Sequence, residues 1–519
     1  MVLDRLASLV SAARRAGALD PRQFGASAAA ISRWGASLVV PYAAAAARFP
    51  ERAAVIDDHE TVSYAELDQR STQLAAAMSA AGLNAGDVVG LMARNGALFL
   101  DALVATSKCG LVPVLLNTEF APEQLVGVLD REDVVGLVHD GSTADVVAAA
   151  AFDGVTLDQH AGASLPADGA PPMPRQSLRN PVVPILLTSG TTGTPKGARR
   201  SLAADPRPAI GVLERIPVRT GDTVYIACPL FHAWGFAQLL TTGVLAGTVV
   251  VSARFDVEAT ITAVERRRPD VLVTVPTVLQ RLLGSDALDG ADLSSLRVVA
   301  CSGSALPMAT SAAWLDRVGD NLYNLYGSTE VGQATLATPD DLRVAPGTVG
   351  RPISGTEVAI LDDSGARVRA GEVGAIHVGS GSNFQGYTGG GGKAVVDGLM
   401  ATGDVGYLDD DGRLFVTGRT DDMIVSGGEN VYPLEVEELL LTDAGVADVA
   451  VVGVPDDDFG GRLVAYVVRV PGSEIGEADL KAMVAARLSR FKVPRMIEFV
   501  DELPRTATGK VLRRRLADE

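Results

Sequence analysis

The stretch LTSGTTGTPKG at residues 187–197 decides the fold class, and it directly follows an apolar run at residues 182–187. Glycines let a backbone approach a phosphate closely, and the amides and hydroxyls of such a turn donate hydrogen bonds to it. The stretch differs from the GxxxxGK[ST] loop of P-loop NTPases, because Pro195 precedes Lys196 and Gly197 follows it. We therefore predict a polyphosphate-binding turn after a buried strand, rather than an ordinary flexible loop.

Helical and strand patterns alternate on both sides of this turn. Apolar residues at helical spacing predict a helix over residues 64–81, and residues 88–92 read as a buried strand. A second alternation runs from residue 224 to about residue 300, with a helix near 257–267 and a strand at 271–275. Strands that alternate with helices indicate parallel sheets with helical crossovers.

The pattern changes after about residue 348, where short strands are separated by Gly and Asp turns. Such spacing is typical of a small β-barrel or distorted sheet, and a compact α+β segment then closes the chain. A chain of 519 residues is too long for one ordinary core. We predict an α/β protein: a domain of two parallel α/β sheets and a small distorted β-barrel over residues 1–419, and a small mobile α+β domain over residues 420–519.

Charge and composition exclude several classes of protein. The formal net charge is -18, and the arginine clusters at 266–268 and 513–515 are short enough to be solvated helix faces. Nucleic acid is therefore not expected as a partner. The three cysteines and five histidines are scattered, which indicates reduced thiols and no clustered metal site.

The N-terminal residues indicate a cytoplasmic protein. They lack the basic start and long apolar run of a signal peptide. Residues 3–17 are predicted to form an amphipathic helix, for which packing against the body of the protein is preferred over contact with a membrane surface.

Four further segments contain polar residues of the kinds that phosphate and ribose chemistry needs. They are NLYGSTE at 324–330, TGD at 402–404, GRTDD at 418–422 followed by SGGEN at 426–430, and PRTATGK at 504–510. With the turn at 187–197, and in this order, they resemble the adenylate-forming superfamily of acyl-CoA synthetases, peptide-synthetase adenylation domains and luciferases. The resemblance extends from about residue 50 to the end of the chain.

This resemblance implies that the chain joins a carboxylic acid to ATP as an acyl adenylate and then passes the acyl group to a thiol. The implied catalytic residues are Lys510, Thr329 and Glu330, and Glu330 would also hold Mg²⁺, a hard cation that prefers carboxylate oxygen. The implied ATP- and AMP-binding residues are Thr188, Ser189, Gly190, Thr191, Thr192, Lys196, Gly303, Ser304, Ala305, Asn324, Tyr326, Gly327, Asp404 and Arg419.

The resemblance also implies individual roles. Tyr326 would stack on adenine while Asn324 reads the edge of the ring, and Asp404 would accept hydrogen bonds from the ribose hydroxyls beside Arg419. Lys510 would bridge the carboxylate and the α-phosphate, cancelling charge as the bond forms. Taken singly, each acid or lysine could be a solvated surface residue, but the ordered set of motifs favours the functional interpretation.

A domain movement is implied by two more elements. Asp421 matches the hinge of the family, and Gly427 and Gly428 match the loop that borders the pantetheine chain of coenzyme A. The chain departs from the family pattern in the glycine run at 389–392, which leaves the mobility of that segment open, and in the arginines at 199–200.

The segment PLFHAWGF at 229–236 resembles the lining of the family's acyl pocket, which makes His232, Trp234 and Phe236 candidate pocket residues. Trp234 is either a gate of an acyl tunnel or a core residue. Few charged residues occur here or in residues 271–283, so an amino acid is less favoured than a fatty or aromatic acid. We expect a medium- or long-chain fatty acid.

Coenzyme A is the expected acceptor, because the chain ends nine residues after Lys510 without a fused carrier domain. The alternative is an acyl-AMP ligase that loads a separate acyl carrier protein. A non-catalytic nucleotide sensor or a luciferase-type oxygenase represents another class of function, and the presence of Lys510 speaks against the sensor. The sequence leaves the oligomeric state open.

Overall fold

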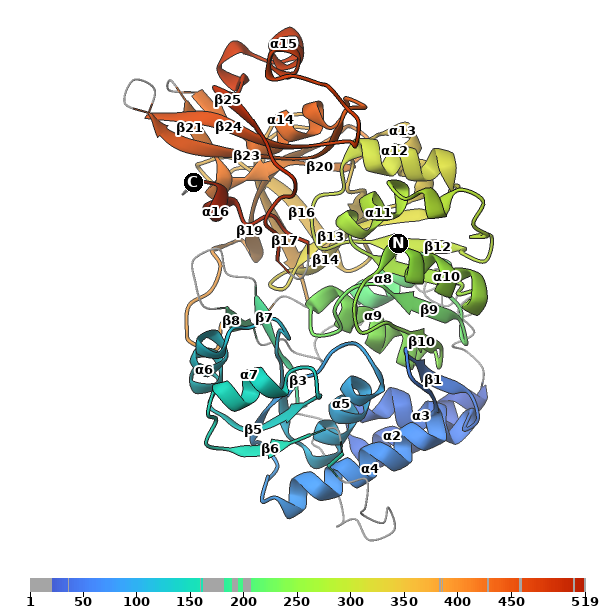
Figure 1. Ribbon diagram of the computed structural model, residues 1–519. Helices are drawn as coiled ribbons and strands as arrows, with labels where there is room; N and C mark the ends of the chain where they lie inside the picture. Colours follow the sequence, from blue (N-terminus) through green and yellow to red (C-terminus); the bar gives the residue numbers. More distant parts are fainter. Residues whose placement is uncertain are drawn as a thin grey trace.

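The computed structural model describes residues 21–35, 37–158, 160–161, 182–188, 195–198, 207–381, 384, 386–426, 429–456, 460–506 and 509–517. The predicted N-terminal amphipathic helix lies outside these residues, as do Ser189, Gly190, Thr191, Thr192, Gly427, Gly428 and the arginines at 199–200. Figure 1 shows the α/β part of the chain in blue through green to yellow, with the C-terminal segment in orange and red above it.

The first sheet has nine strands, and its central six are parallel. In spatial order they are β15 (Arg351–Pro352), β14 (Gly332–Ala337), β13 (Leu322–Ser328), β12 (Val298–Cys301), β11 (Val271–Thr274), β9 (Thr223–Ile226), β10 (Thr248–Val250), β1 (Ala53–Ile56) and β2 (Thr61–Ser63). Antiparallel pairing occurs only toward the two edges of this sheet.

The second sheet has six strands, of which all but the last are parallel. In spatial order they are β6 (Val155–Leu157), β5 (Val134–His139), β3 (Val88–Met92), β4 (Val112–Leu115), β7 (Ile185–Thr188) and β8 (Lys196–Ala198). The predicted polyphosphate turn connects β7 to β8, directly after a buried strand.

Helices and one 3₁₀ turn cover these two sheets (Figure 1). They are α2 (Pro21–Trp34), α3 (Val39–Arg48), α4 (Tyr64–Ala80), α5 (Ala97–Cys109), α6 (Pro122–Arg131), α7 (Ala144–Ala149), α8 (Arg207–Arg215), α9 (Ala233–Val244), α10 (Val257–Arg267), η2 (Asp286–Leu288), α11 (Pro276–Leu283), α12 (Met308–Arg317) and α13 (Pro339–Val344). One hydrophobic core joins the two sheets through α3, α4, α5 and α9.

Local sequence explains where the predicted helices begin and end. Ser63 caps α4 in a capping box with Glu66, and the glycine at 82 follows the end of the helix. Asp256 caps α10 by accepting a hydrogen bond from the amide of Ala259 at 2.8 Å. The helices predicted over 64–81 and 257–267 are therefore confirmed within one residue.

The third sheet is antiparallel and consists of β16 (Thr356–Leu361), β17 (Gly374–Ser380), β19 (Leu399–Leu408) and β18 (Val395–Val396), with β20 (Leu414–Arg419) paired to β19. Its buried side chains form a hydrophobic cluster together with Ala198, Val331 and Ala334. The α/β class with two parallel sheets and a small distorted β structure is confirmed.

The C-terminal segment has separate hydrophobic clusters, all of whose buried residues fall within 424–516. Its elements are η3 (Thr420–Asp422), β21 (Ile424–Ser426), β22 (Glu429–Val431), α14 (Pro433–Leu440), β23 (Val446–Asp456), β24 (Gly460–Arg469), α15 (Glu477–Arg487), η4 (Arg490–Lys492), β25 (Met496–Phe499) and α16 (Arg513–Ala517). We call residues 424–517 the C-terminal unit. The domain boundary between residues 419 and 420 stays a prediction.

One arginine cluster differs from expectation. Arg513 does not project into solvent: its guanidinium donates two hydrogen bonds to the buried carboxylate of Glu437, at 2.5 and 2.9 Å, and a third to the carbonyl of Val451. Arg514 and Arg515 are exposed, as predicted. The prediction of a solvated helix face is wrong for Arg513, because the contacts of a five-residue helix depend on tertiary packing and not on its own sequence.

The three cysteines are buried and free, in agreement with the predicted reduced thiols. Within the residues that the structure describes, no helix is both long enough and apolar enough to cross a membrane.

Gly350 joins the nine-stranded sheet to the third sheet, since its carbonyl accepts a hydrogen bond from Leu414 at 2.8 Å. Its φ is +82°, and a Cβ there would lie 2.0 Å from the backbone of Leu336. Gly412 has a similar φ of +73° but open space around it.

We predict that Gly350→Ala lowers the melting temperature more than Gly412→Ala does. Both substitutions lower the free energy of unfolding by about 1–2 kcal/mol, because alanine is strained in the left-handed backbone region. Overpacking adds a further loss of about 1–3 kcal/mol only at Gly350.

Thermal unfolding of the two variants and the parent, followed by circular dichroism, checks this prediction. Equal melting temperatures for the two variants would contradict the close packing at Gly350.

Candidate active site

The predicted site residues of the nine-stranded sheet gather at the carboxyl ends of its parallel strands. Residues 228–236 follow β9, residues 276–280 follow β11, residues 302–308 follow β12, and residues 324–330 lie at the end of β13 and beyond it. The strand order changes direction at β9, because β10 lies on one side of it and β11 on the other. Ligands of open α/β sheets bind at such a point.

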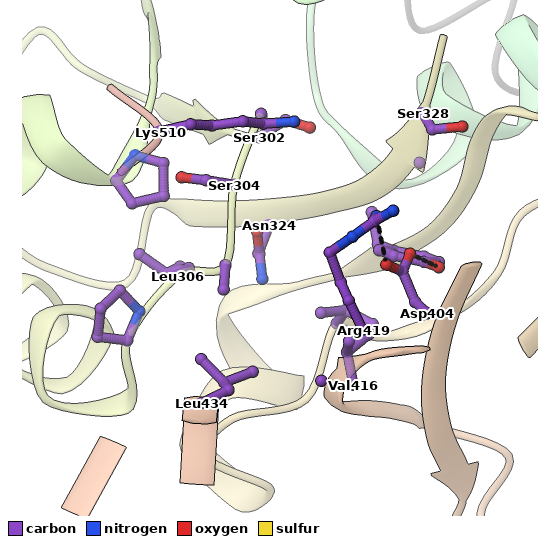
Figure 2. Close-up of a pocket in the computed structure, with 18 of the residues that line it drawn as sticks. Ser302, Ser304, Leu306, Asn324, Ser328, Asp404, Val416, Arg419, Leu434 and Lys510 are labelled. Carbon is purple, nitrogen blue, oxygen red and sulfur yellow. Dashed lines mark hydrogen bonds and ion pairs between the residues drawn. The ribbon is translucent and has the colours of Figure 1, made fainter. Parts of the chain in front are cut away.

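A cavity of about 2080 Å³ opens at this edge, between the sheet and the C-terminal unit. Its size exceeds the roughly 300–1,000 Å³ of a pocket for one small ligand, so it can hold a nucleotide and a second molecule together. The predicted site residues that line it are Thr188, His232, Trp234, Gly303, Ser304, Ala305, Asn324, Tyr326, Gly327, Thr329, Glu330, Asp404, Arg419, Asp421 and Lys510. Figure 2 shows Asn324, Asp404, Arg419 and Lys510 around this space.

Asp404 is held by two side chains. The phenol of Tyr326 donates a hydrogen bond to its Oδ2 at 2.6 Å, and Arg419 pairs with its Oδ1 at 2.9 Å (Figure 2). Burial raises the pKa of Asp404, which the Tyr326 hydrogen bond and the Arg419 charge partly oppose. Burial also raises the pKa of Tyr326, so the phenol remains a donor. Both carboxylate oxygens are thereby held in place by protein partners, and Asp404 lines the cavity.

Lys510 enters the cavity from the C-terminal unit. The preceding Gly509 has a φ of +80°, and a Cβ there would lie 2.3 Å from Oγ1 of Thr277, so only glycine permits this close approach. Desolvation between the cavity walls and the charge of Arg419 lower the pKa of Lys510, against the opposite pull of Asp404 and Glu330. The ammonium therefore lies among the candidate nucleotide-binding residues.

His232 lies beside Lys510 at the start of α9. Burial and the nearby Lys510 ammonium lower its pKa from 6.5 to about 4. The imidazole is therefore neutral at physiological pH and adds no positive charge to this part of the cavity.

Glu330 follows β13 and faces the same space. Its Oε1 accepts a hydrogen bond from the phenol of Tyr387 at 2.8 Å, and its amide donates a hydrogen bond to Ser328 Oγ at 3.2 Å. Neighbouring Thr329 also lines the cavity. Among the described residues there is no group of three or more potential metal ligands. A single carboxylate nevertheless fits Mg²⁺, which commonly binds through one or two carboxylates and substrate phosphates.

The structure describes the two ends of the polyphosphate turn, whereas residues 189–194 lie outside the described residues. Thr188 lines the cavity and donates a hydrogen bond to the carbonyl of Lys196 at 3.1 Å. The Lys196 ammonium lies 5.4 Å from the centre of the Tyr387 ring. Lys196 does not line the cavity, unlike Thr188.

The strand ends form the wall expected for adenine. Gly303 has a φ of +99° and follows β12, and Asn324 is a buried residue of β13. A Cβ on Gly327 would lie 1.9 Å from the carbonyl of Gly332, so the turn there requires glycine.

The three candidate acyl-pocket residues are placed differently from one another. His232 and Trp234 line the cavity, whereas Phe236 packs in the hydrophobic core without lining it. Trp234 is 6% exposed, and its Nε1 donates a hydrogen bond to the carbonyl of Thr274 at 3.0 Å. The indole is thus a fixed wall in this conformation, and the gating role stays a prediction.

The sequence reasoning missed two residues of the site. Lys393 lines the cavity and lies close enough to Asp404 to oppose the rise in its pKa. Tyr387 contacts both Glu330 and Lys196. Both residues lie close to the glycine run at 389–392, where the chain departs from the family pattern. The scarcity of lysine, with only six in the chain, was the one feature of the sequence that could have indicated Lys393 as a site residue.

A cavity that can hold a nucleotide and a second molecule, at the carboxyl edge of a parallel sheet and entered by a lysine from a second unit, is what a nucleotide-dependent ligase or transferase requires. The chain belongs to the AMP-binding enzyme family, which matches residues 42–388, and the AMP-binding enzyme C-terminal domain matches residues 435–510. The predicted superfamily is confirmed, and the chain is an acid–thiol ligase that works through an acyl adenylate. Adenylate-forming CoA ligases use ATP, Mg²⁺ and coenzyme A.

The chain is similar to characterised enzymes over most of its length. It is 36% identical to a feruloyl-CoA synthase of an Amycolatopsis species, covering 89% of this chain and 95% of the relative. It is 31% identical to a fatty acid–[acyl-carrier-protein] ligase of Streptomyces coeruleorubidus, covering 90% and 93%. Its fold matches o-succinylbenzoate CoA synthetase of Bacillus subtilis, solved with its acyl-adenylate intermediate, with a TM-score of 0.83, 28% identity and coverage of 92% and 98%.

The position of Lys510 can be tested through His232. Lys510→Met removes the ammonium while keeping the side-chain length. We predict that the pKa of His232 rises above about 4 but stays below 6.5, because burial is the larger of its two causes. Titration followed by NMR of the histidine ring signals, assigned with a His232→Gln variant, measures this shift.

Lys481→Met is the matched control, since Lys481 pairs with Glu477 on α15 and does not line the cavity. An unchanged pKa of His232 in Lys510→Met would contradict the placement of Lys510 beside it.

Proposed function

We propose that this enzyme is an ATP-dependent acid–CoA ligase whose acid is an apolar monocarboxylic acid carrying a ring. The observation that supports this best is the scarcity of charge in one half of the cavity. Among the described cavity-lining residues between 207 and 349, the ionisable side chains are His232, Tyr326 and Glu330. His232 is neutral, and the other two lie on the nucleotide side.

The side of the cavity that we assign to the acid is lined by residues of two helices, α9 and α8. Trp234, Ala237, Leu240, Thr241 and Val244 form one stripe of α9 at helical spacing. Pro208, Val212 and Leu213 of α8 also line the cavity. A second carboxylate or an ammonium group on the acid would be desolvated here without a partner, which is costly. An amino acid or a dicarboxylic acid is therefore disfavoured.

The preference for a ring rests on the relatives. Feruloyl and indoleacetate, in the names of two similar enzymes, are ring-bearing monocarboxylic acids. The medium- or long-chain fatty acid expected from the sequence becomes the second candidate. It is supported by the fatty acid ligase among the relatives and by Val244, which is 63% exposed at the far end of the α9 stripe and leaves that end of the cavity open.

In the proposed first step, a carboxylate oxygen attacks the α-phosphorus of ATP and the bond to pyrophosphate breaks. Lys510 would neutralise charge on the reacting oxygens, and Thr329 would donate to the α-phosphate. Tyr326 and Asn324 would bind the adenine, and Asp404 the ribose. Glu330 would hold Mg²⁺, which neutralises phosphate charge when bound.

In the second step the thiolate displaces AMP from the acyl group. We propose that the C-terminal unit rotates about Asp421 to admit coenzyme A, because hinges lie at element ends that absorb backbone change. Asp421 lies in η3 directly after β20, and its side chain is within 3.4 Å of Arg419. Gly427 and Gly428, proposed to border the pantetheine chain, lie outside the described residues. The carrier-protein acceptor remains the alternative, supported by the carrier-protein ligase among the relatives.

Pyrophosphate release tests the substrate class. The panel contains ferulate, indole-3-acetate, dodecanoate, phenylalanine and a dicarboxylic acid, each with coenzyme A or with a purified acyl carrier protein bearing its pantetheine. We predict turnover with the ring-bearing monoacids and coenzyme A. Highest turnover with dodecanoate would select the fatty-acid candidate, and turnover only with the carrier protein would select the other acceptor. Turnover of phenylalanine would contradict the uncharged acyl pocket.

Lys510→Ala separates the two half-reactions. Losing one charge partner of a transition state typically lowers the rate roughly 10²- to 10³-fold. We predict a loss of that size in acyl-adenylate formation, measured as pyrophosphate release, with thioester formation from supplied acyl-AMP much less affected. An equal loss in both half-reactions would contradict the assignment of Lys510.

A further inference from the structure

Phe384 and residues 386–388 lie between two parts of the candidate phosphate site that are far apart in sequence. The amide of Phe384 donates to the carbonyl of Glu330 at 2.7 Å. Four residues later, the amide of Thr388 donates to the carbonyl of Gly197 at 2.9 Å, next to a β-bridge between Ala198 and Tyr387. This segment therefore connects the end of the polyphosphate turn to the turn after β13.

The Tyr387 side chain contacts the charged group of each part. Its phenol donates a hydrogen bond to Glu330 Oε1 at 2.8 Å, and its ring lies 5.4 Å from the Lys196 ammonium. The edge-to-face contact with Phe384, with ring centres 4.9 Å apart, restricts the ring. The phenol is the donor in its hydrogen bond with Glu330, because an ionised carboxylate can only accept.

We propose that Tyr387 is a positioning residue that orients the Glu330 carboxylate for the Mg²⁺ of bound MgATP. The hydrogen bond engages Oε1, which would leave Oε2 to bind the cation. Hydrogen bonds to ionised carboxylates are among the stronger ones, and they add geometric restraint as well as energy. The cation–π contact of the same ring with Lys196 places a positive charge at the end of the polyphosphate turn. This inference rests on the proposed metal-binding role of Glu330.

The test compares ATP binding with and without Mg²⁺, in the absence of any acid substrate, by titration calorimetry. Tyr387→Phe removes the phenolic donor and keeps the ring beside Lys196. We expect the Mg²⁺-dependent gain in ATP affinity to fall about 10-fold, while the Kd of ATP in EDTA changes less than about twofold. The Mg²⁺ concentration that half-saturates pyrophosphate release should rise to a similar degree.

Tyr225→Phe is the matched control, because it also removes a phenolic hydrogen bond, to Ser252 at 3.2 Å, but in β9 away from the cavity. It should leave both affinities unchanged. Tyr387→Leu, which also removes the ring, should weaken metal-free ATP binding in addition.

Two outcomes would overturn the positioning role. One is a Mg²⁺ dependence of Tyr387→Phe equal to that of the parent, and the other is an equal loss of affinity with and without Mg²⁺. A parent enzyme whose ATP binding does not respond to Mg²⁺ would instead refute the metal-binding role of Glu330, on which the inference depends. Activity with the acid panel is measured separately, so failure of the proposed substrate class is distinguishable from both.

Discussion

The common direction of six parallel strands is the constraint on which the rest of this structure depends. Because their carboxyl ends meet at one edge, segments separated by a hundred residues converge there. His232 after β9, Thr277 after β11, Gly303 after β12 and Glu330 after β13 come together without any direct sequence relationship. The change of strand order at β9 keeps the connections from covering that edge, so a cavity forms where these segments meet.

Electrostatics explains why this cavity suits a polyphosphate in an acidic protein. The chain has a formal net charge of -18, yet Lys393, Arg419 and Lys510 all face the same space. Desolvation and mutual repulsion lower the pKa of Lys510, and a bound triphosphate would relieve both effects. The carboxylates of Asp404 and Glu330 limit the repulsion and are themselves held in place by tyrosines.

The cavity is divided into a charged half and a neutral half, which matches the two kinds of substrate of an adenylating enzyme. The neutral half is bounded by the indole of Trp234, which is hydrogen-bonded to the backbone, and by the uncharged imidazole of His232. The reacting carboxylate would lie at the junction, where Lys510 enters from the C-terminal unit. Since Gly509 packs against Thr277 in this conformation, moving the C-terminal unit would withdraw Lys510 and open the junction to a thiol.

The sequence by itself determined the α/β class, the bounds of strongly periodic elements such as α10, and the set of motifs, because periodicity and motif spacing are local properties. It also indicated Asp404 and Lys510 as site residues, because the motif around each of them consists of a few adjacent residues. Only the tertiary structure decided the contacts of Tyr387, Arg513 and Trp234. The groups that they hydrogen-bond, and the Lys196 ammonium beside Tyr387, lie between 40 and 191 residues away along the chain. The physical reason is that hydrogen bonds and ring contacts depend on where strands and helices pack, and packing on that scale leaves no regular pattern in the neighbouring sequence.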